Sequence, residues 1–97
     1  MTIKLVKTCT AYPEQYDAYE NGERVGYLRL RHGHFRVDCP VSGGETVFRA
    51  EPRGDGMFED DERDFHLTCA VLAIRYWVVR RAGGGEPLYE IDDRDAV

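Results

Sequence analysis

Cysteine is scarce in this chain of 97 residues, and it does not occur in the patterns through which it usually carries structure or chemistry. Cys9, Cys39 and Cys69 lie far apart, with no Cys-x-x-Cys pair among them. An odd, sparse set argues against a secreted disulfide scaffold and is typical of proteins in a reducing compartment. We therefore expect a cytoplasmic protein whose cysteines are small buried residues.

Long hydrophobic runs are also missing. The longest apolar stretch, Leu67 to Val79, is interrupted by Thr68 and Arg75 and is shorter than the ~20 residues that a bilayer-spanning helix needs. The first nine residues carry Lys4 and Lys7 without the apolar run of a signal peptide. These absences predict a soluble protein with no membrane partner.

Catalytic and metal-binding patterns are absent as well. Ser42 is the only serine, and it lies in a glycine-rich loop without the Gly-x-Ser-x-Gly turn of a nucleophile. Cys39 and His34 fall on opposite faces of one predicted strand, and His66 has only Cys69 one helical turn away, whereas zinc needs about four converging ligands. No glycine-rich phosphate loop opens a helix. We expect no enzyme, no cofactor and no metal site.

What the chain does contain is a series of strand and turn signals. Asn21-Gly22 supplies the two positive-φ residues of a tight hairpin turn, and His32-Gly33 can play the same role in the next hairpin. The segments around these turns are rich in β-branched and aromatic residues. We predict strands at Thr2 to Thr10, Tyr16 to Glu20, Glu23 to Arg31, His34 to Cys39 and Thr46 to Glu51.

The segment from Phe58 to Ala82 has the signals of a helix. Acids crowd its first turn, where they suit the positive end of the helix dipole and where Asp60 or Asp61 can cap the free amides. Two arginines occupy the last turn, and Gly83 is placed to end the helix. In an alternative interpretation the helix ends near Ala73, and the following residues pair with a C-terminal strand.

In that alternative, Arg75 to Arg81 forms a hairpin with Pro87 to Asp92. The favoured prediction is an α+β fold, in which an antiparallel β-meander of four to five strands carries one long helix, from the C-terminal half, on one face. Leu88 to Ile91 is then a short final edge strand. Residues 1–91 are predicted to form a single domain, and residues 92–97 a frayed acidic tail.

Alternation along the strands assigns the predicted meander two faces, if Glu20 lies opposite Glu23 and Arg31 opposite His34. The core face then holds Tyr19, Leu28, Leu30, Phe35, Val37 and Cys39. The open face holds Tyr16, Tyr27, Arg29, Arg31, His34 and Arg36, with Ala18, Val25 and Asp38 among them.

Charge is divided along the chain, although the net charge is −5. Residues 24–36 contain four arginines and no acid, whereas residues 51–64 contain seven acids and two arginines, and the last twelve residues contain five acids and one arginine. Arginines between tyrosines on an open sheet are typical of single-stranded nucleic-acid platforms. They also suit an acidic protein partner, or an ordinary solvated face whose arginines pair with acids of the chain.

The predicted helix is apolar on two sides. At about 100° per residue, one stripe holds Phe65, Cys69, Leu72, Tyr76 and Val79, and the other holds Leu67, Val71, Ile74 and Val78. A helix lying on one sheet needs a single apolar stripe. We expect the second set to contact a second copy in a homodimer or a partner groove, unless the segment at Leu88 to Ile91 covers it.

In its small size, acidic balance and lack of catalytic motifs, the chain resembles accessory proteins of phages and mobile elements, including the anti-CRISPR inhibitors of bacterial defence. This resemblance carries over no residues and implies a protein that acts by occluding a partner. The sequence thus favours a non-catalytic binding protein that acts by protein–protein contact. The alternative is a nucleic-acid-binding module that uses the Arg/Tyr sheet face.

Overall fold

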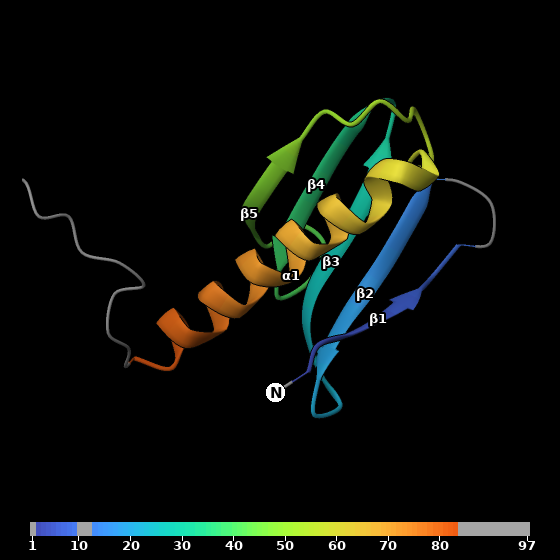
Figure 1. Ribbon diagram of the computed structural model, residues 1–97. Helices are drawn as coiled ribbons and strands as arrows, with labels where there is room; N and C mark the ends of the chain where they lie inside the picture. Colours follow the sequence, from blue (N-terminus) through green and yellow to red (C-terminus); the bar gives the residue numbers. More distant parts are fainter. Residues whose placement is uncertain (1, 10–12, 84–97) are drawn as a thin grey trace, which may run out of the picture.

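The computed structural model describes residues 2–9 and 13–83, and it contains one antiparallel sheet and one helix (Figure 1). The five strands follow one another in the sheet in chain order: β1 (Lys4–Lys7), β2 (Glu14–Glu20), β3 (Glu23–Arg31), β4 (His34–Cys39) and β5 (Glu45–Ala50). The helix α1 (Asp60–Arg81) packs on one face of this meander and contacts β3, β4 and β5. The predicted α+β fold is confirmed.

The alternative hairpin at residues 75–81 is wrong, because these residues form the last two turns of α1. The final edge strand predicted at Leu88 to Ile91 and the acidic tail at residues 92–97 lie outside the described residues. No helix in the described ranges is long and apolar enough to cross a membrane.

Both predicted hairpin turns are present. Asn21 and Gly22 have φ values of 53° and 80°, and His32 and Gly33 have φ values of 53° and 74°. These are the left-handed conformations that a two-residue turn between antiparallel strands requires. The turns therefore fix the pairing of Glu20 with Glu23 and of Arg31 with His34, as the sequence predicts.

The pairing between β2 and β3 changes register after the first two residue pairs beyond the turn, Glu20 with Glu23 and Tyr19 with Arg24. Between Ala18 and Tyr19 a β-bulge inserts one extra residue of β3, so that Tyr16 lies opposite Leu28 rather than Tyr27. Because side chains alternate along a strand, a shift of one residue moves them to the other face. Four assignments of the sequence analysis are therefore wrong: Tyr16, Ala18 and Val25 are in the core, and Tyr19 lies on the open face.

The core lies between the sheet and α1. Its buried apolar side chains are Tyr16, Ala18, Val25, Leu28, Leu30, Phe35, Val37, Cys39, Phe58, Ala70 and Ile74. Val25, assigned to the open face from sequence, is among them because it lies at the bulge. The helix approaches β3 so closely that a Cβ on Gly26 would lie 2.7 Å from Cδ1 of Ile74.

The sequence predicts the C-terminal end of α1 correctly and its N-terminal cap incorrectly. The N-cap is Glu59 rather than Asp60 or Asp61, and the side chain of Glu62 accepts a hydrogen bond from the backbone N–H of Glu59. At the other end Gly83 adopts a φ of 76° and its N–H donates to the carbonyl of Arg80, which confirms it as the residue that ends the helix.

Candidate anion-binding face

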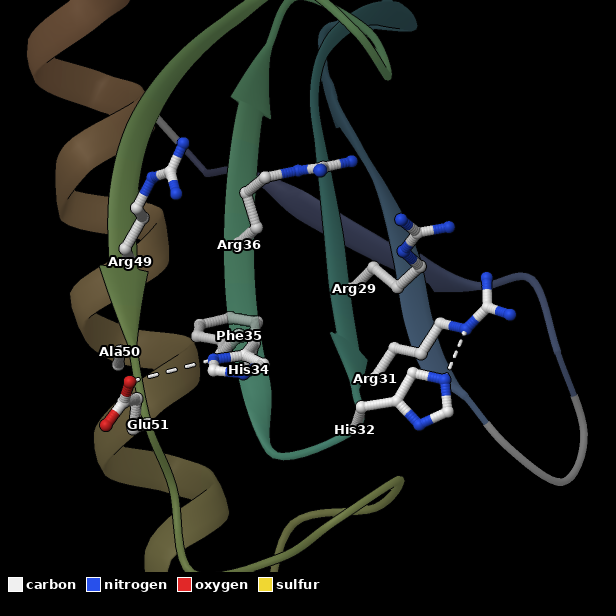
Figure 2. A pocket seen from close by; sticks show the side chains of 9 residues that line it. All are labelled: Arg29, Arg31, His32, His34, Phe35, Arg36, Arg49, Ala50 and Glu51. Carbon is white, nitrogen blue, oxygen red and sulfur yellow. Dashed lines mark hydrogen bonds and ion pairs between the residues drawn. The ribbon is translucent and has the colours of Figure 1, made fainter.

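Three arginines lie side by side across the open face of the sheet, the face away from α1 (Figure 2). Arg29 on β3 is directly opposite Arg36 on β4, and Arg36 is directly opposite Arg49 on β5. We call these three residues the arginine row. Neighbouring strands are ~4.8 Å apart, so the row places three guanidinium groups within reach of one compact anionic group.

The arginine row borders a depression of about 780 Å³ in the surface. Its lining residues are Arg29, Arg31, His32, His34, Phe35, Arg36, Arg49, Ala50 and Glu51. Arg31 and His34 are paired across the strands at the turn end of the depression, where Nε of Arg31 also lies 3.3 Å from Nε2 of His32. The lining is therefore strongly cationic.

Acids of the chain neutralise little of this charge. Nε of Arg36 lies 3.2 Å from Oδ2 of Asp38, but the buried Asp38 carboxylate also accepts hydrogen bonds from the N–H of Gly43 and the hydroxyl of Thr46. Arg29 and Arg49 form no ion pair with any residue in the described ranges. Like charges directly opposite each other destabilise a sheet, so the arginine row costs stability within the protein itself.

The single acid that lines the depression lies at its rim. Glu51 follows the end of β5, and its Oε1 lies 3.7 Å from Nδ1 of His34, with both side chains exposed. Asp55 lies next to the same rim, because its carbonyl accepts a hydrogen bond from the N–H of Gly33. The acids thus border the cationic depression on the side of the β3–β4 turn instead of filling it.

The structure brings together most of the partner-binding residues that the sequence predicts. Tyr27, Arg29, Arg31, His34 and Arg36 share the open face, and the hydroxyl of Tyr27 donates to Oε1 of Gln15. Tyr16 is not among them. No tyrosine in the described part of the chain lines the depression.

Arg49 is the residue of this face that the sequence analysis missed. It lies in the predicted strand at Thr46 to Glu51, but that strand had no assigned register. A second irregularity in the pairing, between Val37 and Asp38, makes the register of β5 impossible to extrapolate from the loop before it. The signal that could have found Arg49 is its two-residue alternation with the apolar Phe48 and Ala50.

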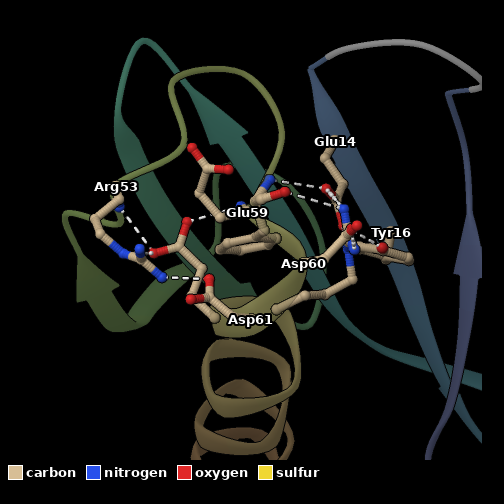
Figure 3. Close-up of polar contacts among 9 residues, drawn as sticks. Glu14, Tyr16, Arg53, Glu59, Asp60 and Asp61 are labelled. Carbon is tan, nitrogen blue, oxygen red and sulfur yellow. Dashed lines mark hydrogen bonds and ion pairs between the residues drawn. The ribbon is translucent and has the colours of Figure 1, made fainter.

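A second cluster of ionisable groups is buried where β2 meets the first turn of α1 (Figure 3). Glu14 is fully buried, and both of its carboxylate oxygens accept hydrogen bonds from the guanidinium of Arg63, at 2.9 and 3.1 Å. Glu14 also accepts hydrogen bonds from the hydroxyl of Tyr16 and from the N–H of Phe58. Arg63 continues to Asp60 and to the carbonyl of Phe58.

These contacts shift the pKa values of the buried groups. Burial alone would raise the pKa of Glu14, but the hydrogen bonds from Arg63, Tyr16 and Phe58 hold it below its ordinary value. Burial and the neighbouring carboxylate of Glu14 raise the pKa of Tyr16 to about 12. Both oxygens of the Glu14 carboxylate accept hydrogen bonds from donors of the chain. The cluster therefore joins β2 to α1 and leaves neither oxygen free to bind a substrate.

The carboxylate of Glu62 joins the loop before α1 to the helix. It accepts hydrogen bonds from the backbone N–H groups of Arg53, Gly54 and Glu59. Burial would raise the pKa of Glu62, but these three hydrogen bonds lower it to about 2. A Cβ on Gly54 would lie 1.8 Å from the carbonyl oxygen of Met57, so the loop that presents these amides requires glycine at this position.

The histidines and cysteines are not gathered into a ligand set. Within the described ranges, no group of three or more His, Cys, Asp and Glu side chains is placed to hold a metal ion. His66 instead stacks on the ring of Phe58, with a centroid separation of 5.3 Å. All three cysteines are free thiols, and burial raises the pKa of Cys39 to about 12.

The helix carries a second exposed surface, but its residues are not those that the sequence assigned to a partner. Of that set, Ile74 is fully buried, and Leu67 and Val78 pack against the core. The other stripe is the exposed one. Its large side chains are exposed by 66% (Phe65), 57% (Leu72), 44% (Tyr76) and 42% (Val79).

The position of the sheet decides which of the two apolar stripes is buried and which is exposed. Both stripes are apolar, so hydrophobic periodicity alone does not say which one the sheet covers. The buried Glu62, Ala70 and Ile74 lie four or eight residues apart on one side of α1 and fix the covered face. The predicted dimer or partner face at Leu67, Val71, Ile74 and Val78 is therefore wrong for Ile74, Leu67 and Val78, and Val71 is half-buried.

Comparison of the chain with protein-family models, with curated proteins and with solved structures found no match in any of the three.

Proposed function

We propose that this protein is a non-catalytic binding protein that docks on an acidic surface of a protein partner through its arginine row. The observation that carries the proposal is the cross-strand alignment of Arg29, Arg36 and Arg49 beside a cationic depression, with no ion pair to Arg29 or Arg49 in the described ranges. A row of like charges weakens the sheet that holds it. An anionic partner would remove this repulsion on binding.

The chemistry of the row suits carboxylates. A guanidinium group binds a carboxylate through two parallel N–H···O bonds, which adds orientation to charge attraction. Three such groups on adjacent strands would match a cluster of Asp and Glu side chains on a folded partner. The contact would act mainly on the association rate and on the choice of partner, because complementary surface charge steers diffusional encounter.

The surroundings of the row favour a compact acidic patch over a nucleic acid. A nucleic-acid strand would extend beyond the depression. On the side of the β3–β4 turn its phosphates would meet the carboxylate of Glu51 and the acidic segment that follows Glu51. Stacking platforms for bases use aromatic side chains beside the cations. Of the two tyrosines predicted on this face, Tyr16 is buried, and Tyr27 is partly buried, is bonded to Gln15 and does not line the depression. The chain as a whole also carries a net charge of −5.

A cytoplasmic location accords with this proposal. All three cysteines are free thiols, as is usual in a reducing compartment. The protein would act there by covering a surface of its partner, which requires no catalytic group of its own.

The experiment compares two anionic probes of equal charge, a polyglutamate peptide and a single-stranded oligothymidylate, by fluorescence anisotropy. We expect tighter binding of polyglutamate, and a loss of about tenfold in affinity for Arg29→Gln/Arg49→Gln, since an exposed ion pair contributes up to about 1 kcal/mol and about 1.4 kcal/mol corresponds to tenfold in affinity. The matched control is Lys4→Gln/Arg24→Gln, which also removes two positive charges, because the exposed Lys4 and the Asp17-paired Arg24 both lie outside the depression.

Tighter binding of the oligothymidylate, with a log–log salt slope of about −0.7 per neutralised phosphate, would replace the proposal by the nucleic-acid alternative. Equal weakening by the control variant would mean that net charge, and not the arginine row, attracts the probe. Absence of binding to both probes at low salt would refute an anion-binding face altogether.

A further inference from the structure

The exposed stripe of α1 follows the spacing of a helix that pairs with another helix. Its residues, which we call the helix seam, are Phe65, Cys69, Leu72, Tyr76 and Val79. Their spacing alternates between four and three residues, which is the repeat of the contact positions in a coiled coil. Four of the five are large apolar side chains that are 42–66% exposed. A contiguous exposed apolar surface of this kind marks an interaction site.

The helix seam is nearly symmetric about its central residue. Leu72 has Cys69 and Tyr76 three and four residues away, and Phe65 and Val79 each seven residues away. A two-fold dimer brings one patch against the same patch of the other copy, so the patch must be complementary to itself. An antiparallel pair centred on Leu72 places Phe65 of one copy against Val79 of the other.

Charge at the two ends of α1 selects the antiparallel direction. The first two turns carry Asp60, Asp61 and Asp64, and the last turn carries Arg80 and Arg81. In the described ranges Asp64 and the two arginines form no ion pair, although Arg80 and Arg81 lie over the rings of Tyr76 and Trp77. An antiparallel pair sets the acidic end of each helix, and the positive end of its dipole, beside the basic end of the other. A parallel pair would set like charges together.

From these observations we infer that the helix seam binds a second copy of this chain, with the two α1 helices antiparallel and Leu72 at the two-fold axis. The helix is already formed on its sheet, so association does not have to stabilise an isolated helix. The last turns of α1 extend beyond the sheet (Figure 1), which leaves room for the partner helix along the seam.

The dimer would have two arginine rows. Because α1 and the arginine row lie on opposite faces of the sheet, pairing through α1 leaves both rows on the outside of the dimer. A partner with repeated acidic sites would then be bound twice, and the second contact would form at a high effective concentration. This consequence rests on the proposed function, whereas the dimer itself does not.

The first test is the mass of the full chain in solution. Light scattering should give about twice 11.1 kDa, and Leu72→Glu should return the mass to that of one chain. Since Leu72 is 57% exposed, this variant should keep its helical circular dichroism, and its unfolding midpoint should no longer depend on protein concentration as that of a dimer does. Val6→Glu adds the same charge to an exposed apolar side chain on β1, which does not contact α1, and should remain a dimer.

The second test is the direction of pairing, measured with a short bifunctional thiol reagent on a Cys9→Ser/Cys69→Ser background, in which the remaining Cys39 is buried. In an antiparallel dimer Phe65→Cys/Val79→Cys should be cross-linked between copies, whereas neither single variant should be. Cross-linking of each single variant to itself would mean a parallel pair and would overturn the proposed orientation.

A mass of one chain at protein concentrations up to about 1 mM, where even weak association is detectable, would overturn the dimer. If Leu72→Glu left that mass unchanged and lowered the unfolding midpoint, the seam would be covered by the chain itself. Binding of polyglutamate by monomeric Leu72→Glu tests the proposed function separately from the dimer. Its loss would count against the proposed function, and its retention at lower avidity for an immobilised probe would support the bivalent dimer.

Discussion

The two faces of this sheet hold their charges in opposite ways. On the covered face Glu14 meets four hydrogen-bond donors, two of them from Arg63. On the open face Arg29 and Arg49 have no ion-pair partner in the described ranges, and each lies directly opposite Arg36. Burying a charge is unfavourable unless it is paired, whereas an exposed charge can remain unpaired at small cost. The charges on the covered face therefore stabilise the fold, whereas Arg29 and Arg49 on the open face do not take part, within the described part of the chain, in ion pairs that would stabilise it.

The comparison predicts its largest effect for a change that unpairs the buried side. Arg63→Ala leaves the carboxylate of Glu14 buried without its cation, and breaking a buried pair in this way typically costs about 3–5 kcal/mol. The free energy of unfolding, measured by urea denaturation, should fall by this amount. The double variant Glu14→Leu/Arg63→Met should recover a large part of the loss, because both charges are then removed. A loss below about 1 kcal/mol for Arg63→Ala, the usual range for surface pairs, would contradict the distinction between the two faces.

The pH dependence of stability should come from the covered face too. The unfolded chain takes up protons on Glu62 as the pH falls below the ordinary pKa of 4.5, whereas the folded protein holds that carboxylate ionised down to a pKa of about 2. The stability that Glu62 contributes is therefore complete above pH 4.5 and is lost between pH 4.5 and about 2. Glu14, whose pKa is also lowered by its hydrogen bonds once burial is overcome, acts with the same sign.

Tyr16 acts at the other end of the pH range. Its pKa is raised from 10.0 to about 12 by burial and by Glu14, so its contribution is complete below pH 10 and is lost as the pH rises toward 12. Thermal unfolding across pH should show both limbs. Glu62→Gln should flatten the acid limb and Tyr16→Phe the alkaline limb, with Asp64→Asn as the exposed control. An acid limb of unchanged slope in Glu62→Gln would refute this assignment.

Sequence patterns predict the parts of this fold that local chemistry decides. The turns at Asn21-Gly22 and His32-Gly33, the helix end at Gly83 and the acids of the first helical turn are all local signals, and all are present. The bulge at Val25 was not predicted, although a glycine inside a strand, here Gly26, often marks a bulge. The sequence therefore placed Tyr16 and Tyr19 on the wrong faces, although it placed the later residues of β3 correctly.

The candidate sites divide along the same line. Arg29, Arg31 and Arg36 were predicted to share the open face because a tight turn fixes the register of β3 and β4. Arg49 was missed because β5 follows a loop and a second pairing irregularity. The choice between the two stripes of α1 depended on which side the sheet covers, and neither stripe carries that information in its own residues.

The smallest expected effect, and the most direct check of the open face, is that Arg29→Gln does not destabilise the protein. Removing one charge from the arginine row relieves the repulsion with Arg36 opposite it, so the free energy of unfolding should stay the same or rise by up to about 0.5 kcal/mol. Salt should produce the same gain in the unmutated protein, because surface repulsion is screened within about 3 Å at 1 M ionic strength. The two proteins should therefore become equally stable at high salt.

The control, Arg24→Gln, removes an arginine that is paired with Asp17 and should show no gain at low salt. A loss of more than about 1 kcal/mol in Arg29→Gln would mean that Arg29 contributes to the fold, and the arginine row would then no longer stand out from the charges on the covered face.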